Sequence, residues 1–223
     1  MPFRDRRAAG RRLAVRLTDF RDAEAVVLGV PRGGVPVAYE VARALNAPLT
    51  VAMVRKLRVP YRPELAFGAI GEGGVGVIDD KILARAFVSE SGRAEVESEQ
   101  RAELARSAIR YRGGSSALAL HGRTAVIVDD GIASGVTARA AVAVVRAAGA
   151  ERIALAAPVG AASAIRTLSG KVDQVVCLEG AEVVTAISRW YGDYAPVDDA
   201  QVCDLLDGAA AELRQRSGES GQR

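Results

Sequence analysis

Five short apolar runs lie along the chain, separated for the most part by segments in which apolar residues recur every three or four positions. An uninterrupted apolar run of this length is typical of a strand that is buried on both faces of a sheet. The first run ends in a turn rich in proline and glycine, which also favours a strand. We therefore expect strands at residues 25–30, 49–54, 124–128, 153–158 and 172–178.

Segments with helical periodicity lie before, between and after most of these runs. The expected helices cover residues 4–20, 37–45, 136–148 and 160–169. Buried strands that alternate with helices predict an α/β fold, in which a mostly parallel, twisted sheet carries helices on both faces. A chain of 223 residues is long enough to form one such domain, residues 1–223.

Residues 57–115 interrupt the alternation. Two apolar segments, 67–70 and 75–78, flank four residues that include three glycines, which predicts a hairpin. A charged helical stretch follows at about 90–112. We interpret residues 57–115 as an insertion between core strands and as a candidate flexible lid, and we expect the polar tail 216–223 to be frayed.

Composition excludes several classes of protein. A formal net charge of +3, with 26% charged residues, is not the pattern of a dedicated nucleic-acid-binding protein. No apolar run approaches the roughly 18 residues needed to cross a bilayer, and no apolar stretch follows the arginine-rich start, so we expect a cytoplasmic protein without a membrane partner. Cys177 and Cys203 have no second cysteine or histidine cluster beside them, which favours reduced core residues. A homodimer is one of the assembly states that the sequence leaves open.

Candidate chemistry is concentrated where the expected strand 124–128 ends. Asp129 and Asp130 follow this strand, at the sheet edge where open α/β sheets place ligands. A small-residue loop then leads into a helix, whose free N–H groups suit a phosphate dianion through hydrogen bonds worth roughly 1.5–3 kcal/mol each. The acidic pair would repel phosphate, so it must face sugar hydroxyls or a ligand-borne magnesium ion. The residues of this loop are Gly131, Ile132, Ala133, Ser134, Gly135, Val136 and Thr137. The alternative is an ordinary strand-to-helix turn with an aspartate cap.

An apolar strand, two acids and a small-residue loop with a Ser/Thr-Gly-x-Thr ending resemble the signature of type I phosphoribosyltransferases, which bind 5-phosphoribosyl-1-pyrophosphate (PRPP). The resemblance implies that Asp129 and Asp130 hold the ribose 2- and 3-hydroxyls. It implies that Ile132 to Thr137, hereafter the phosphate loop, wrap the 5-phosphate. It also implies a Mg²⁺ cofactor that enters with PRPP and meets the two acids mostly indirectly, through PRPP and water.

A second loop, residues 29–36, follows the first expected strand, at the place where the resembling enzymes keep their pyrophosphate loop. That loop often holds a strained, sometimes cis, non-proline peptide, for which Arg32-Gly33 is the natural candidate. Arg32 would fork onto pyrophosphate, with Gly33 and Gly34 allowing close approach. Taken alone, the Pro-Arg-Gly-Gly sequence is only a turn.

Two weaker features complete the candidate site. Lys56 and Arg58 lie where type I enzymes close a flexible loop over the ligand, although exposed cations at a strand end would look the same. Trp190 and Tyr191 lie in a candidate hood, residues 178–200, that would cover the acceptor; packing onto the sheet is the alternative. The candidate catalytic residues are Arg32, Lys56, Asp129 and Asp130.

The resemblance extends over about residues 20–200 and is closest to bacterial proteins that share the opening Phe3–Arg6, the Pro-Arg-Gly-Gly loop and a Trp-Tyr-x-Asp sequence. It implies a phosphoribosyltransferase that transfers the 5-phosphoribosyl group of PRPP to a nitrogenous base or amine and releases pyrophosphate. Ala133 replaces the acid that is usual in enzymes for 6-oxopurines, which disfavours hypoxanthine and guanine. A non-catalytic sensor of PRPP or a nucleotide is the alternative. A GxGxxG match at residues 71–76 continues into a strand, which excludes a dinucleotide site there.

Overall fold

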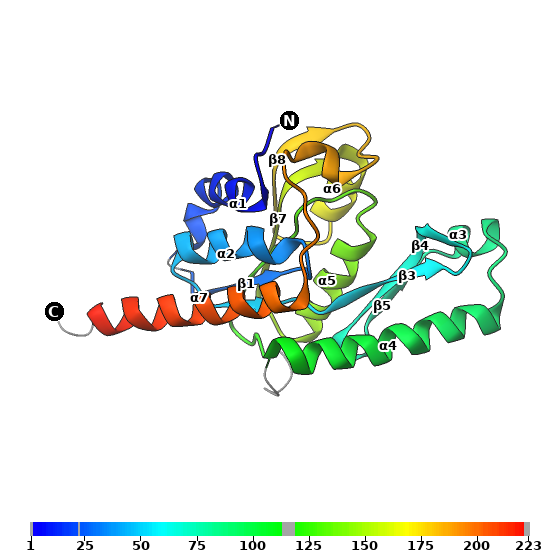
Figure 1. Ribbon diagram of the computed structural model, residues 1–223, viewed down its shortest axis with the longest axis horizontal. Helices are drawn as coiled ribbons and strands as arrows, with labels where there is room; N and C mark the ends of the chain where they lie inside the picture. Colours follow the sequence, from blue (N-terminus) through cyan, green and yellow to red (C-terminus); the bar gives the residue numbers. More distant parts are fainter. Residues whose placement is uncertain (1, 22, 113–118, 221–223) are drawn as a thin grey trace.

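The computed structural model describes residues 2–21, 23–112 and 119–220 and is built around a five-stranded parallel sheet (Figure 1). The strand order is β2-β1-β6-β7-β8, and every neighbouring pair is parallel. All five residues of both β1 and β6 are buried, which explains their unbroken apolar sequences. The strands are β1 (Ala25–Gly29), β2 (Leu49–Val51), β6 (Thr124–Val128), β7 (Arg152–Ala161) and β8 (Gln174–Ala181).

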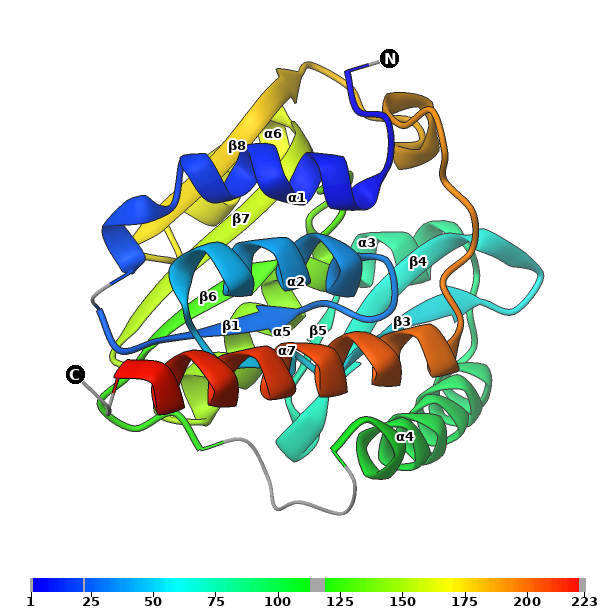
Figure 2. The ribbon, with the colours of Figure 1, turned by 60° about the vertical axis from the view of Figure 1, so that its left-hand side comes forward.

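Helices cover both faces of the sheet, as the α/β prediction requires. One layer consists of α1, α2 and α7, and the other of α5 and α6 (Figures 1 and 2). Each layer has its own apolar core against the sheet: one joins Leu13 and Val41 to Val27, and the other joins Val145 and Leu168 to Ile127. These helices are α1 (Arg6–Val15), α2 (Gly34–Leu45), α5 (Val136–Ala147), α6 (Ala162–Ser169) and α7 (Asp199–Ser220).

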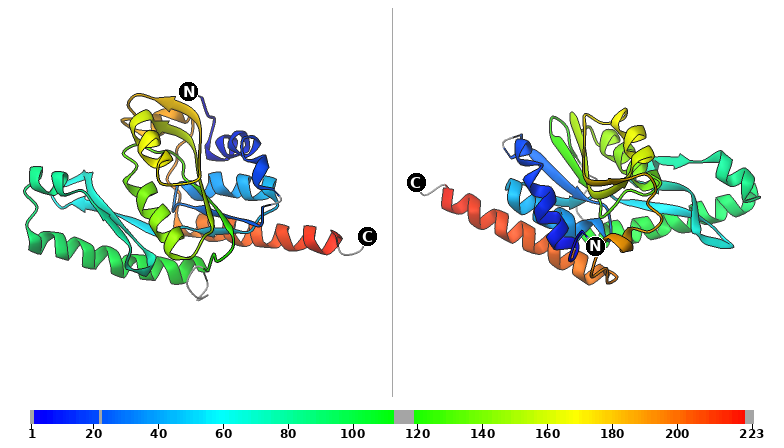
Figure 3. Two further views of the ribbon diagram at one scale, coloured as in Figure 1. Left: turned by 180° about the vertical axis from the view of Figure 1, so that it is seen from behind. Right: turned by 90° about the horizontal axis from the view of Figure 1, so that it is seen from above.

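A second unit projects from the sheet and is here called the arm, Val54–Arg112 (Figure 3). Its three-stranded antiparallel sheet has the order β3-β4-β5 and packs beside the long helix α4. The β4–β5 pairing joins Gly68 to Ile78, where the sequence predicted a hairpin. The elements are β3 (Val54–Val59), β4 (Arg62–Gly71), η2 (Glu72–Gly74), β5 (Gly76–Ile78), α3 (Asp80–Arg85) and α4 (Glu90–Arg112).

Segments from opposite ends of the chain lie side by side at one end of the sheet. The backbone N–H of Phe3 donates to the carbonyl of Trp190, and Gly192 N–H donates back to the carbonyl of Phe3. Trp190 ends the short 3₁₀ helix η3 (Ile187–Trp190), which follows β8. This ladder fixes the start of α1 next to the segment that leads into α7.

Several element boundaries differ from the sequence prediction; β7 and β8, for example, both extend three residues beyond the expected ends 158 and 178. The expected strand 49–54 ends at Val51, and Val54 already begins β3 in the arm, so the inserted unit starts before residue 57. The expected helix 4–20 is α1 followed by the 3₁₀ turn η1 (Thr18–Phe20). Helix α7 extends to Ser220, through the first part of the predicted tail 216–223. Residues 113–118 of the predicted insertion and 221–223 of the predicted tail lie outside the described residues.

Candidate functional site

The two candidate loops meet at the carboxyl ends of β1 and β6 and enclose a pocket of about 260 Å³. Neighbouring parallel strands end at the same edge of a sheet, so residues about a hundred positions apart become neighbours here. We call this space the central pocket. Its lining residues are Arg6, Val30, Pro31, Gly33, Lys56, Asp129, Asp130, Gly131, Ile132, Ala133, Ser134, Gly135, Thr137, Ala138, Ile187 and Tyr194.

The glycines of loop 29–36 let its backbone lie directly against the acidic pair. A Cβ atom on Gly33 would lie 2.0 Å from Oδ2 of Asp130. A Cβ atom on Gly34 would lie 2.6 Å from the carbonyl oxygen of Val128 and 3.0 Å from Cα of Asp129. Both positions are too close for a real Cβ contact, so the packing of the two loops requires glycine at each.

The phosphate loop is anchored to the neighbouring strand β7. Ile132 N–H donates to the carbonyl of Val159 at 2.9 Å, and Ala161 N–H donates to the carbonyl of Ile132 at 2.8 Å. Gly135 then adopts a left-handed conformation (φ 75°), which glycine tolerates without strain, and α5 begins at Val136. The first turn of α5 therefore presents its N–H groups to the central pocket beside Ser134 and Thr137, as an anion site requires.

The two adjacent acids have different surroundings. Oδ1 of Asp129 accepts from the backbone N–H of Asp130 at 2.8 Å. Burial, together with the neighbouring charge of Asp130, raises the pKa of Asp129 to about 8, and the positive charge of Lys56 opposes that rise. Asp130 is 8% exposed, and its Oδ2 accepts from Arg6 Nε and from the Tyr194 hydroxyl, each at 2.9 Å.

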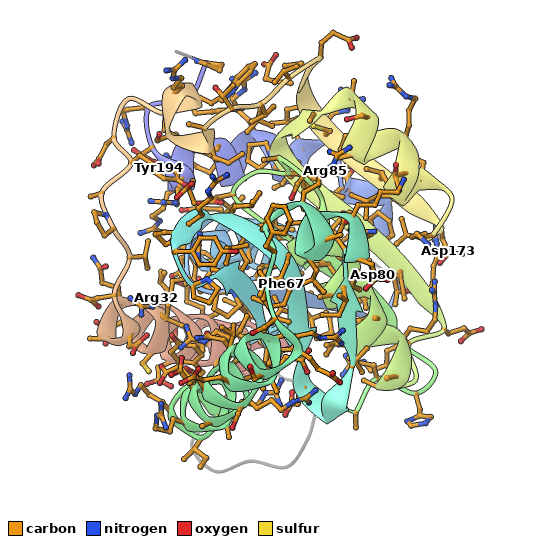
Figure 4. The ribbon with its side chains drawn as sticks, turned by 90° about the vertical axis from the view of Figure 1, so that its right-hand side faces the viewer. Arg32, Phe67, Asp80, Arg85, Asp173 and Tyr194 are labelled. Atoms are coloured by element: carbon orange, nitrogen blue, oxygen red, sulfur yellow. The ribbon has the colours of Figure 1, made fainter. Side chains whose placement is uncertain are left out.

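The structure divides the predicted cations between the pocket and other surfaces. Lys56, on β3, lines the central pocket. Arg32 does not: its Nε pairs with Asp199 at 3.0 Å, near the start of α7 (Figure 4). Arg58 donates to the carbonyl of Pro63 within the arm. The Arg32 side chain in this conformation therefore lies apart from the residues that it was predicted to join.

The cis peptide of loop 29–36 lies one bond earlier than predicted. It joins Pro31 to Arg32, whereas the sequence suggested Arg32-Gly33. The special backbone was correctly assigned to this loop, but its position was wrong. Pro31 and Gly33 line the central pocket, whereas Gly34 and Val136 of the predicted ligand-binding set do not.

The aromatic hood differs from the prediction. Tyr191 is 2% exposed, its ring packs 5.5 Å from that of Phe3, and its hydroxyl donates to the carbonyl of Asp130 at 2.6 Å. Trp190 packs against apolar residues and does not line the central pocket. Packing, the alternative interpretation, is therefore correct for Tyr191, which has no free face for a base. From this segment, Ile187 and Tyr194 reach the pocket instead.

Arg6 is the main site residue that the sequence analysis missed. It comes from the first turn of α1, and its Nη1 also donates to the carbonyl of Ala195 at 2.8 Å. Although burial alone would lower it, the pKa of Arg6 is raised because Asp130 accepts its hydrogen bond. A signal existed, because Arg6 belongs to the opening motif that carried part of the resemblance.

Other site classes have no counterpart in the described part of the chain. Across residues 2–21, 23–112 and 119–220, no group of three histidine, cysteine or acidic side chains could hold a metal ion. Both cysteines are free thiols, and burial raises the pKa of each. Among the helices described, none is long and apolar enough to cross a membrane.

The fold and the central pocket together define an α/β protein of the phosphoribosyltransferase type. The family model for the phosphoribosyl transferase domain matches residues 76–190, just over half of the chain, including the acidic pair and the phosphate loop. The chain therefore belongs to the phosphoribosyl transferase domain family.

Individual relatives agree with this assignment. A protein of Mycobacterium tuberculosis, named "putative phosphoribosyl transferase" in strains H37Rv and CDC 1551, is 48% identical over 96% of the chain. The chain spans about half (48%) of the length of that relative. The crystal structure of TT1426 from Thermus thermophilus is 40% identical, covers 92% of this chain and 98% of its own, and superposes with a TM-score of 0.74.

Proposed function

We propose that this chain binds PRPP with magnesium in the central pocket and transfers the 5-phosphoribosyl group to a nitrogenous base or amine, with release of pyrophosphate. The observation that carries the proposal is the direct packing of Gly33 and Gly34 against Asp130 and Asp129. This packing brings a phosphate loop, an acidic pair and a second backbone loop into one pocket. A ligand with phosphates on both sides of a sugar needs all three.

Each part of the pocket has a role in this proposal. Ser134, Gly135 and Thr137, with the first turn of α5, bind the 5-phosphate. Asp129 and Asp130 accept hydrogen bonds from the ribose hydroxyls. The backbone at Gly33 and the Lys56 ammonium bind pyrophosphate, and the rate gain comes mainly from positioning and from stabilising the leaving group.

The donor set fits magnesium only as a ligand-borne ion. Two adjacent carboxylates provide hard oxygen donors, but the described residues contain no third group to complete a protein-held site. Asp129 and Asp130 would therefore meet the ion mostly through PRPP and water. When bound, the ion neutralises charge on the pyrophosphate and so assists its departure.

The arm is proposed as the cover of the pocket. It contributes Lys56 directly, and its base lies against α5, where the ligand phosphate would bind. Movement of the arm over bound PRPP would exclude water from the reacting carbon.

Sensing without turnover is the second candidate, and one observation favours it. Arg32, the residue expected to stabilise the leaving group, is paired with Asp199 and with the carbonyl of Val197 rather than directed into the pocket. A protein that only binds the ligand would not need Arg32 there.

The first test is binding. Isothermal titration calorimetry with magnesium PRPP should show heat for the wild type and none for the double variant Asp129→Asn, Asp130→Asn, because an amide nitrogen, which cannot accept a hydrogen bond, replaces one carboxyl oxygen at each position. An undiminished heat in the double variant would refute the role of the acids.

The second test is turnover. Pyrophosphate release is measured with a panel of nucleobases and amines. Release with one member supports transfer, whereas silence across the panel with intact binding supports the sensor.

A further inference from the structure

Asp130 is held by two residues that are far apart in the sequence. Arg6 donates through Nε to Oδ2 of Asp130, and Tyr194 donates its hydroxyl to the same oxygen. The guanidinium of Arg6 lies 3.7 Å from the centre of the Tyr194 ring, so the two donors also support one another. We call this arrangement of Arg6, Tyr194 and Asp130 the clamp.

The backbone brings both donors to the acid. The ladder between Phe3 and Trp190–Gly192 continues with Asp193 N–H donating to the carbonyl of Arg4 at 2.7 Å. Arg6 begins α1 two residues after this bond, and Tyr194 follows it directly. The side chains of Arg6 and Asp130 are only 10% and 11% exposed, so water competes little for this ion pair.

The clamp decides which carboxylate oxygens remain available. Oδ1 of Asp129 is taken by the N–H of Asp130, and Oδ2 of Asp130 is taken by Arg6 and Tyr194. Both acids line the central pocket, so each can still accept a hydrogen bond from a ligand there.

The two acids also differ in how their negative charge is compensated. The guanidinium of Arg6 compensates Asp130 within the protein, so the pocket does not confront an anionic ligand with two free negative charges. Lys56 lines the same pocket, and its positive charge opposes the rise in the pKa of Asp129. A doubly phosphorylated ligand is repelled less by this arrangement than by an unpaired acidic dyad.

We propose that Arg6 and Tyr194 are positioning residues for the sugar: they fix Asp130 so that one oxygen from each acid faces one of two neighbouring sugar hydroxyls. This inference rests on the proposed function, since it concerns how the same pocket recognises the ribose. It adds a role for the first helix, which lies outside the residues matched by the family model.

The test compares probes that differ in one hydroxyl. Titration calorimetry measures ribose 5-phosphate, 2-deoxyribose 5-phosphate and inorganic phosphate against wild type, Arg6→Gln, Arg6→Lys and Tyr194→Phe. The wild type should prefer ribose over deoxyribose. Arg6→Gln should lower the affinity for ribose 5-phosphate by roughly tenfold, which is the equivalent of one charge-assisted hydrogen bond. It should also largely remove the preference for ribose 5-phosphate over 2-deoxyribose 5-phosphate.

The conservative variants grade the effect. Arg6→Lys should keep part of the preference for ribose because it keeps the positive charge. Tyr194→Phe should lower the affinity for ribose 5-phosphate less than Arg6→Gln does, by roughly twofold to fivefold, because the ring still supports Arg6. Inorganic phosphate should bind all four proteins equally, since the phosphate loop is anchored on β7.

Arg12→Gln is the matched control. Arg12 lies on the same helix, bonds to Glu179 and to the carbonyl of Pro2, and does not line the central pocket. It should lose some stability but keep the sugar preference. The inference is overturned if Arg6→Gln keeps the wild-type preference for ribose over deoxyribose. It is also overturned if Arg6→Gln lowers the affinity for inorganic phosphate as much as the affinity for ribose 5-phosphate. A wild type that binds no magnesium PRPP would instead refute the proposed function itself.

Discussion

Gly33 lies where loop 29–36 approaches Asp130 most closely. A methyl group there would overlap Oδ2 of Asp130, the oxygen that also accepts from Arg6 and Tyr194. Gly33→Ala should therefore displace Asp130 and weaken magnesium PRPP binding by more than about tenfold, a loss comparable to one charge-assisted hydrogen bond. Titration calorimetry measures this directly.

Gly170→Ala is the control for that substitution. Gly170 ends α6 with an ordinary negative φ, and a Cβ atom there would meet nothing within 4 Å. Its affinity for magnesium PRPP should equal that of the wild type. Equal affinity in both variants would show that the contact between the loops is not needed for binding.

The carboxyl group of Asp129 makes stability depend on pH. Its pKa in the folded chain is about 8, above the unfolded value of about 3.9, so the folded state holds a proton that the unfolded state has lost between these values. Stability from this group is therefore present at low pH and is lost as the pH rises through that window.

Asp129→Asn should remove this contribution. Urea unfolding between pH 5 and 8 should show a steeper fall for the wild type than for the variant, by at most about 1.4 kcal/mol per pH unit. Parallel curves for wild type and Asp129→Asn would mean that the carboxyl is ionised throughout.

At the scale of elements, Asp199 joins three parts of the fold. It accepts from Arg32 of loop 29–36 and from Arg110 and Tyr111 of α4. The hydrogen bond from Tyr111 is the main cause that lowers the pKa of Asp199. Burial and Asp199 raise the pKa of Tyr111 to about 12, so the phenol remains a donor. The position of Arg32 is thus coupled to the arm through one carboxylate.

Asp199→Asn should release Arg32 toward an anion in the central pocket. Affinity for magnesium pyrophosphate should rise about threefold in calorimetry, since the competing ion pair is weakened. Asp207→Asn, exposed two turns further along α7, should change nothing. An unchanged affinity in Asp199→Asn would show that Arg32 does not take part in pyrophosphate binding.

The core elements were predictable from the sequence because their information is local. The apolar run 124–128 matches β6 residue for residue, and the loop after it is part of the central pocket. Side-chain partners were not predictable: Arg6 and Asp130 are 124 positions apart, and no periodicity links them. The directions of Arg32 and Tyr191 likewise depend on α7 and on Phe3, which only the folded chain brings near.

For the whole molecule, the attachment of the arm to the core decides whether it can act as a cover. Arg112, 8% exposed at the end of α4, donates to Glu72 at 2.6 Å and to the carbonyl of Val51 at the end of β2. Neither Arg112 Nε nor Glu72 Oε2 has a hydrogen-bond partner among the described residues, so this buried pair depends on its single strong contact. It lies where Gly71 packs against Val144 of α5.

Glu72→Ala would leave the Arg112 guanidinium buried without its carboxylate. Removal of one partner of a buried pair typically costs about 3–5 kcal/mol, and the partial exposure of Glu72 places the expected loss in the free energy of unfolding near the lower value. Glu97→Ala, which removes only surface pairs within α4, should cost less than about 1 kcal/mol. Hydrogen exchange should quicken in β3, β4 and β5 of Glu72→Ala while β1 and β6 stay protected, because the core does not depend on this pair. Equal acceleration in β1 and β6 would mean that arm and core unfold as one unit, and the arm could not then open independently over the pocket.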